Sequence, residues 1–285
     1  MQKSLFPVLL AVVAFYSCNL TRSAQPEPTY IHIDSFSFSP SSVSGVTTHE
    51  ITSVWAYYNN NPIGTFDLPA TIPVIANGSG VLELSPGITI DGLNALTGAY
   101  PFYQIDTFSF TAQPGKIINH EAHTQFYDDV VIKTIADFTI SNEFYLWKQG
   151  GQVPITRPLV DSETEGGNNG QLGSIYITAA GDSSVDSSAL AFPIPSGSAF
   201  IELDYTCDMS FSIGLQANIV GGISASPFYF VGVFPSGQWQ KMYVNVADFA
   251  AQYKAESYNL YIKAVLPPGQ AAGRVLLDNI QLVAY

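Results

Sequence analysis

The chain has 285 residues, of which 47% are hydrophobic and 12% are charged, and its formal net charge is −13. With 10 Lys and Arg residues in total, it lacks the clustered cations that nucleic-acid phosphates or an anionic lipid surface require. Composition therefore argues against nucleic acid as a partner and against electrostatic docking on lipid. Residues 30–285 suffice for one large or two modest domains.

The chain begins with a predicted signal peptide, residues 1–17. Its apolar run, residues 5–16, is too short for a bilayer, which needs about 20 apolar residues. Cys18 follows one small residue, after the bulky Phe15 and Tyr16 in place of the small residues of an ordinary cleavage site. This arrangement resembles a bacterial lipoprotein signal, in which the Cys becomes the lipid-bearing first residue. It departs from the commonest form, but looser forms occur in Bacteroidota-type lipoproteins.

The resemblance implies lipidation of Cys18 and a lipid anchor in the outer membrane without a transmembrane helix. Residues 18–29 are polar and contain two prolines, which predicts a flexible tether. No acidic cluster follows Cys18, so the choice between the periplasmic and the cell-surface face stays open. The alternative is an unmodified Cys in an ordinary signal.

Residues 30–127 show short alternating segments separated by turns and almost no helical periodicity. Residues 51–58 read as a strand, 59–62 as a turn rich in Asn, and 63–68 as the returning strand. Six or seven such strands in about 100 residues indicate an immunoglobulin-like β-sandwich. The stretch 57–74 resembles the small Ig-like or PEGA-type β domains of exported bacterial proteins.

Residues 128–285 also alternate, most clearly over 201–215. There one parity is apolar and includes Cys207, while the other carries Glu202 and Asp204. The pattern predicts one long strand with an apolar face in a core and a polar face in solvent, so that Cys207 is a core residue. A single short helix is predicted within residues 246–256.

The order of motifs over residues 137–285 resembles the galactose-binding-like jelly rolls, which include many carbohydrate-binding modules. The likeness is carried by Phe144, Trp147, Gly167, Ser174, Trp239, Asp278, Asn279 and Ile280. We therefore expect an all-β chain, with an N-terminal Ig-like β-sandwich at 30–127 followed by a jelly-roll β-sandwich at 128–285.

Two segments imitate metal motifs. His120 and His123 are three residues apart in a predicted strand, so they point to opposite faces and do not form a zincin site. Residues 161–166 match the start of an EF-hand loop, but Leu172 stands where the bidentate Glu should be. The jelly-roll resemblance implies a structural Ca²⁺ as an open alternative, because Asp278 matches the Asp of the terminal strand. Otherwise Asp278 forms hydrogen bonds at the strand end, and no other cofactor is expected.

Nothing in the sequence assembles a nucleophile with a base. Glu202 and Asp204 would lie about 7 Å apart on one strand face, a separation that glycosidases also use. Any solvent-facing strand produces such pairs, so we predict a protein that is not an enzyme.

Two aromatic pairs are the candidate ligand-binding residues: Trp55 with Tyr57, and Tyr145 with Trp147. Each pair lies on one face of its predicted strand, and an exposed aromatic ring can stack on a sugar, although core packing is the alternative for each of them. We predict a lipid-anchored cell-envelope protein that binds glycan through its C-terminal jelly roll. The alternative is a structural or adaptor lipoprotein that docks a protein partner at an edge strand or sheet face.

Overall fold

The computed structural model describes residues 26–40, 46–92, 96–147, 150–158, 171–219, 221 and 226–285. The predicted signal peptide, Cys18, most of the tether, residues 161–166 and Gly167 lie outside the described residues. Within the described ranges the chain is almost entirely β, with helix α2 (Ala247–Tyr253) inside the predicted span. None of the helices in these ranges is long and apolar enough to cross a membrane.

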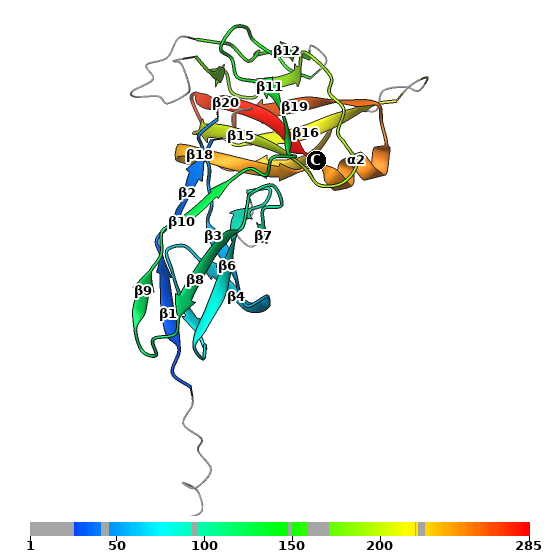
Figure 1. The fold of residues 1–285 in the computed structure, drawn as a ribbon. Coiled ribbons are helices and arrows are strands. Elements are labelled where there is room, and N and C mark those ends of the chain that lie inside the picture. Colours follow the sequence, from blue (N-terminus) through cyan, green and yellow to red (C-terminus); the bar gives the residue numbers. More distant parts are fainter. Residues whose placement is uncertain are drawn as a thin grey trace, which may run out of the picture.

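The first group of strands forms an N-terminal β-sandwich, which stands below the rest of the molecule in Figure 1. Its sheets have the orders β5-β1-β9, β10-β2 and β4-β3-β6-β7, with β8 also paired to β6. Alternation builds its core, because every second side chain of β5 is buried. The strands are β1 (Thr29–Ile33), β2 (Phe36–Ser39), β3 (Ser53–Tyr58), β4 (Asn61–Asp67), β5 (Ala70–Val74), β6 (Ser79–Thr89), β7 (Thr97–Ala99), β8 (Asp106–Thr111), β9 (Ile117–Asn119) and β10 (Ala122–Gln125).

The second group forms two five-stranded antiparallel sheets that enclose one large apolar core. We call β11-β20-β15-β18, with β13 on β20, the junction sheet, and β12-β14-β19-β16-β17 the outer sheet. The predicted all-β class, with one β-sandwich followed by a second, is confirmed. The strands are β11 (Val131–Ala136), β12 (Phe144–Leu146), β13 (Gly173–Ile177), β14 (Ser183–Ser188), β15 (Ala199–Cys207), β16 (Phe211–Asn218), β17 (Phe228–Val233), β18 (Ser236–Asn245), β19 (Ser257–Val265) and β20 (Gly273–Ala284).

The prediction of one continuous strand over 201–215 is wrong. β15 belongs to the junction sheet and β16 to the outer sheet, and the chain passes between them after Cys207. Both strands turn their apolar parity toward the same core, and Met209 in the crossing is buried there too. Alternation reports which face of a strand is buried and does not report which sheet the strand joins. Cys207 is a buried core residue, as predicted, and burial raises the pKa of its thiol.

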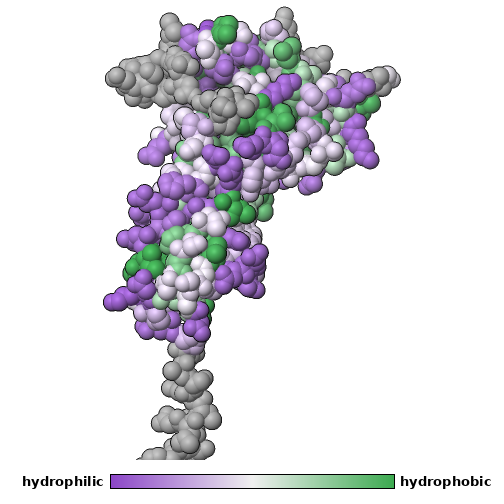
Figure 2. All heavy atoms as spheres, viewed as in Figure 1, coloured by the Kyte–Doolittle hydropathy of each residue, from purple (hydrophilic) through white to green (hydrophobic). Residues whose placement is uncertain are grey.

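The two sandwiches meet at an apolar cluster that draws side chains from both. The Tyr100 ring centroid lies 5.2 Å from that of Phe200 on β15 and 5.0 Å from that of Tyr243 on β18. Figure 2 shows hydrophobic residues reaching the surface in small groups, one of them at the level where the sandwiches meet. The buried members of the cluster are Ile88, Tyr100, Phe102, Tyr103, Phe126, Val130, Phe200, Tyr243 and Val283. This shared core fixes the position of the junction sheet against the N-terminal sandwich.

Candidate functional site

Five residues form one row across the outer sheet, in the order Tyr145, Ser187, Tyr261, Gly214 and Tyr229. The residues beside them in sequence, such as Ile262 and Ile213, are buried in the core, so the row lies on the opposite face of the sheet. Neighbouring strands lie about 4.8 Å apart, which spaces the backbone positions of consecutive tyrosines in the row roughly 10 Å apart. We call this set the tyrosine row; a small residue separates each aromatic ring from the next.

Tyr229, at one end of the tyrosine row, packs against Gly214. A Cβ atom on Gly214 would come 2.9 Å from the Tyr229 ring, and Lys263 Nζ lies 5.5 Å from the centroid of that ring. The Tyr229 hydroxyl is buried and has no hydrogen-bond partner among the described residues. Burial, and secondarily Tyr261, raises the pKa of Tyr229 to about 12, so the phenol stays neutral and keeps its proton to donate.

Tyr261, at the centre of the tyrosine row, is buried, with 4% of its surface exposed, and is held by its neighbours. Its hydroxyl donates a 3.0 Å hydrogen bond to Gln216 Oε1. The Trp147 ring stands edge-on to it, with centroids 6.1 Å apart and planes at 90°. Tyr145, at the other end, is 65% exposed. The predicted binding residues Tyr145 and Trp147 thus lie in and beside this row, and their role in binding stays a prediction.

The other predicted pair, Trp55 and Tyr57, lies on β3 of the N-terminal sandwich. Both side chains are half-buried, while Val54 and Ala56 face the core, so the pair shares the outward face. The structure does not bring this pair together with the tyrosine row, which belongs to the other sandwich.

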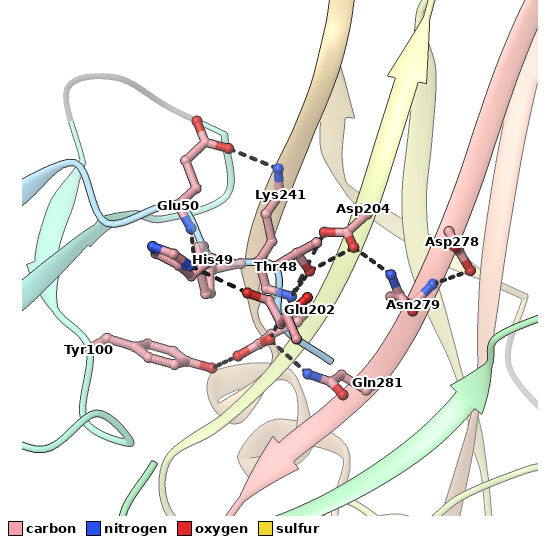
Figure 3. Close-up of polar contacts among 12 residues, drawn as sticks. Thr48, His49, Glu50, Tyr100, Glu202, Asp204, Lys241, Asp278, Asn279 and Gln281 are labelled. Atoms are coloured by element: carbon pink, nitrogen blue, oxygen red, sulfur yellow. Dashed lines mark hydrogen bonds and ion pairs between the residues drawn. The ribbon is translucent and has the colours of Figure 1, made fainter. Parts of the chain in front are cut away.

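A cavity of about 600 Å³ opens where the N-terminal sandwich meets the junction sheet. We call it the junction cleft. Figure 3 shows that its side chains come from a segment before β3 and from β15, β18 and β20. The lining residues are Thr47, Thr48, His49, Glu50, Asp204, Trp239, Gln240, Lys241, Asp278 and Asn279.

Glu202 lies at the base of this region and is fully buried. Its carboxylate accepts a 2.5 Å hydrogen bond from the Tyr100 hydroxyl and a 2.8 Å bond from Gln281 Nε2, and it lies 3.0 Å from Lys241 Nζ (Figure 3). The prediction that Glu202 and Asp204 face solvent is therefore wrong. The polar parity of β15 is covered by the N-terminal sandwich, and it is stabilised there by partners instead of water.

Asp204 is 6% exposed and is held by both sandwiches. Its Oδ2 accepts 2.7 Å hydrogen bonds from Thr48 Oγ1 and from Asn279 Nδ2. Asn279 has a left-handed φ of 50° at a bulge, where the β15–β20 register shifts. Bulges re-aim side chains in this way next to functional sites. The bulge and Thr48 together hold the Asp204 carboxylate in one orientation.

The metal predictions have separate outcomes. Among the described residues no group of three or more His, Cys, Asp or Glu side chains is arranged to hold a metal ion. His120 Nε2 lies 2.5 Å from Asp106 Oδ2, whereas His123 contacts the Ser37 hydroxyl, so the two histidines have different partners. Asp278 is buried and accepts a 2.8 Å bond from the Asn279 backbone N–H. Ca²⁺ at Asp278 stays a prediction.

Sequence reasoning missed Tyr229, Tyr261, Gln216 and Lys263 at the tyrosine row, and Thr48 and Glu50 at the junction cleft. Strand register brings the first set together, and the packing of the sandwiches brings the second. Neither strand register nor the packing of the sandwiches can be read from a short stretch of sequence. The one local signal is that Tyr261 and Lys263 lie on the same side of one strand.

The fold and these sites define an all-β protein of two sandwiches with two candidate ligand-binding surfaces. No protein-family model matches the chain, and a comparison with curated proteins also finds no match.

Solved structures similar to it include a family 11 carbohydrate-binding module from Clostridium thermocellum in complex with a β-1,3-1,4-mixed-linked tetrasaccharide. That likeness has 12% identity and a TM-score of 0.40, and covers 53% of this chain and 94% of that one. A family 29 carbohydrate-binding module has 14% identity and a TM-score of 0.35, covering 54% of this chain and 88% of that one. A family 61 module in complex with β-1,4-galactotriose has 13% identity and a TM-score of 0.33, and the likeness covers 51% of this chain and 89% of that one. Likenesses of this size identify no ligand, so the proposals below rest on the residues of this chain.

Proposed function

We propose that this chain is a non-enzymatic glycan-binding protein and that the tyrosine row is its binding surface. The observation that carries the proposal is the alternation of Tyr145, Tyr261 and Tyr229 with Ser187 and Gly214 across the strands. A sugar ring has an apolar C–H face that stacks on a flat aromatic side chain. Tyr145 and Tyr229, at the two ends of the row, would contact an extended oligosaccharide that lies across the strands, over the small residues and the buried Tyr261.

Polar groups beside the tyrosine row supply the hydrogen bonds that sugar hydroxyls need. Gln216 and Lys263 lie on the same face, in contact with Tyr261 and Tyr229. A few polar groups that converge on an aromatic surface are typical of specific small-ligand sites.

The same proposal includes the lipid anchor at Cys18 and a location at the outer membrane, with the choice of face left open. In Figure 1 the described chain enters β1 at the end of the N-terminal sandwich that lies farthest from the C-terminal sandwich. An anchor before that point would hold the outer sheet away from the membrane surface. Such a placement supports capture of a soluble or neighbouring glycan.

A second candidate function is the docking of a protein partner. Ile140 and Leu190 are 88% and 81% exposed, and Leu190 lines a cavity of about 360 Å³ next to Tyr145. Exposed apolar side chains at a groove favour a protein surface more than a sugar. Purification of a stoichiometric partner that Leu190→Asp releases would support this function.

The test of glycan binding is an array of neutral and acidic oligosaccharides, probed with the mature chain. We expect saturable binding that Tyr145→Ala and Tyr229→Ala each weaken by up to roughly tenfold, because an aromatic stack contributes about 0.5–1.5 kcal/mol. The matched control is Tyr176→Ala, which removes a tyrosine that is 57% exposed on the junction sheet. An array without any saturable signal would overturn the proposal.

A further inference from the structure

We propose that the junction cleft is a second sugar site, which takes a neutral sugar unit of the glycan. The inference rests on the proposed function, because it assumes that the chain binds glycans, but it uses a different set of residues. The cleft has a volume of about 600 Å³, and residues of both sandwiches line it. Sites between two packed units are common places for small ligands.

The first argument is a carboxylate oxygen in the wall of the junction cleft that can accept a hydrogen bond from a ligand. Asp204 uses Oδ2 for two hydrogen bonds, while its Oδ1 has only a 3.8 Å contact with Lys241 Nζ among the described residues. Its side chain is more than nine-tenths buried and lines the cavity. A ligand hydroxyl that donates to this carboxylate oxygen would form a charge-assisted hydrogen bond, which is stronger than one between neutral groups.

A second acceptor faces the same cavity from the N-terminal sandwich. Glu50 Oε2 accepts a 2.8 Å hydrogen bond from the Lys241 backbone N–H. Figure 3 shows the other carboxylate oxygen turned away from that bond, and no hydrogen bond to it occurs among the described residues. A ligand that donates two hydrogen bonds, as neighbouring sugar hydroxyls do, could join Glu50 and Asp204.

Charge decides the class of sugar. The cleft is lined by the carboxylates Glu50, Asp204 and Asp278, and its Lys241 ammonium already lies 3.0 Å from Glu202. An anionic sugar would therefore meet like charges without a spare lysine to neutralise it. Half-buried Trp239 adds an apolar wall, which suits the C–H face of a sugar ring. Together these features select a neutral, hydroxyl-rich unit.

The junction cleft is also preorganised. Thr48 and Asn279 hold Asp204, and the shared apolar cluster holds the two sandwiches together without a ligand. A bound sugar would then lose little free energy to ordering the site. Since it would contact residues of both sandwiches, it should also raise the melting temperature of the mature chain.

The test is isothermal titration of the mature chain. The probes are gluco-, manno- and galacto-oligosaccharides, with a galacturonate oligosaccharide as the anionic probe. The double variant Tyr145→Ala/Tyr229→Ala removes the tyrosine row. We expect it to keep one site for a neutral probe, to bind no galacturonate, and to lose up to roughly tenfold in affinity when Trp239→Ala is added. Glu50→Gln, which keeps the side-chain shape, should weaken the remaining site several-fold.

Three results would overturn the inference. If the double variant loses all binding while the unmodified chain binds, the tyrosine row is the sole site and the proposed function survives. If Trp239→Ala and Glu50→Gln both leave the affinity of the remaining site unchanged in chains with an unaltered melting temperature, the site lies elsewhere. If the unmodified chain binds none of the probes, the proposed function and this inference both fail.

Discussion

The Tyr100 hydroxyl donates a 2.5 Å hydrogen bond to Glu202 Oε1, and this bond connects the two β-sandwiches at the base of the junction cleft. Both residues are buried, and Tyr100 also packs on the aromatic rings of the shared apolar cluster. Burial, followed by the charge of Glu202, raises the pKa of Tyr100 well above its usual value. The phenol therefore remains a neutral donor to a buried carboxylate at any pH near neutrality.

We expect Tyr100→Phe to lower the free energy of unfolding by about 1.5–3 kcal/mol, because the lost hydrogen bond has a charged acceptor. The matched control is Tyr103→Phe, whose hydroxyl lies 3.2 Å from the neutral Tyr243 hydroxyl. That loss should be about 1 kcal/mol. Urea unfolding of both variants measures the difference, and equal losses would show that the Glu202 bond has no special strength.

Removal of the Lys241 ammonium should be more costly. Its Nζ lies 3.0 Å from Glu202, and the side chains are 2% and 0% exposed. Lys241→Met would leave a buried carboxylate without its cation, which typically costs about 3–5 kcal/mol. Lys263→Met is the control, since Lys263 is half-buried and lies over the Tyr229 ring, and its loss should be under about 1 kcal/mol. A Lys241→Met chain as stable as the Lys263→Met chain would contradict the prediction.

Gly214→Ala should damage the tyrosine row directly. Its Cβ would lie 2.5 Å from the Phe228 carbonyl oxygen and 2.9 Å from the Tyr229 ring. We expect a loss of about 1–3 kcal/mol from overpacking, together with weaker glycan binding as Tyr229 shifts. Gly232→Ala tests the specificity of this effect, because no atom lies within 4 Å of its added Cβ. The prediction fails if the two alanine variants unfold at the same urea concentration.

The stability of the chain should carry a pH dependence from Glu50. Burial raises the pKa of Glu50 above its ordinary value of 4.5, while the unfolded chain titrates near that value. Between pH 4.5 and the raised pKa, the native state binds more protons at Glu50 than the unfolded state does. The contribution of Glu50 to the free energy of unfolding therefore falls as the pH rises through the raised pKa. Glu50→Gln removes this titration, and the Gln side-chain oxygen can still accept the hydrogen bond from the Lys241 backbone N–H.

The stability of Glu50→Gln relative to the unmodified chain should therefore be greater at pH 7 than at pH 4. Urea unfolding at the two pH values measures this difference. A relative stability that is the same at both values would show that Glu50 titrates normally in the folded chain.

Local patterns predicted the right kind of structure in several places. The alternation of the 201–215 segment placed Cys207 in the core, and the single predicted helix, within residues 246–256, contains α2. The same alternation misled over Glu202 and Asp204, since a polar face can be covered by another sandwich as well as by water. Tyr145 and Trp147 were found because they lie two residues apart on one strand side. Tyr229 and Tyr261 are 32 residues apart in sequence numbering and were not found.

The sequence by itself determined the all-β class, the apolar parity of residues 201–215 that faces the core, and the acidic character that argues against nucleic acid. These properties follow from side-chain period and charge, which are local or additive along the chain. Only the tertiary structure decided which strands share a sheet, which residues form the tyrosine row, and why Glu202 is buried. Those relations depend on strand register and on packing between sandwiches, where contacting residues are far apart in sequence and no single segment carries the information.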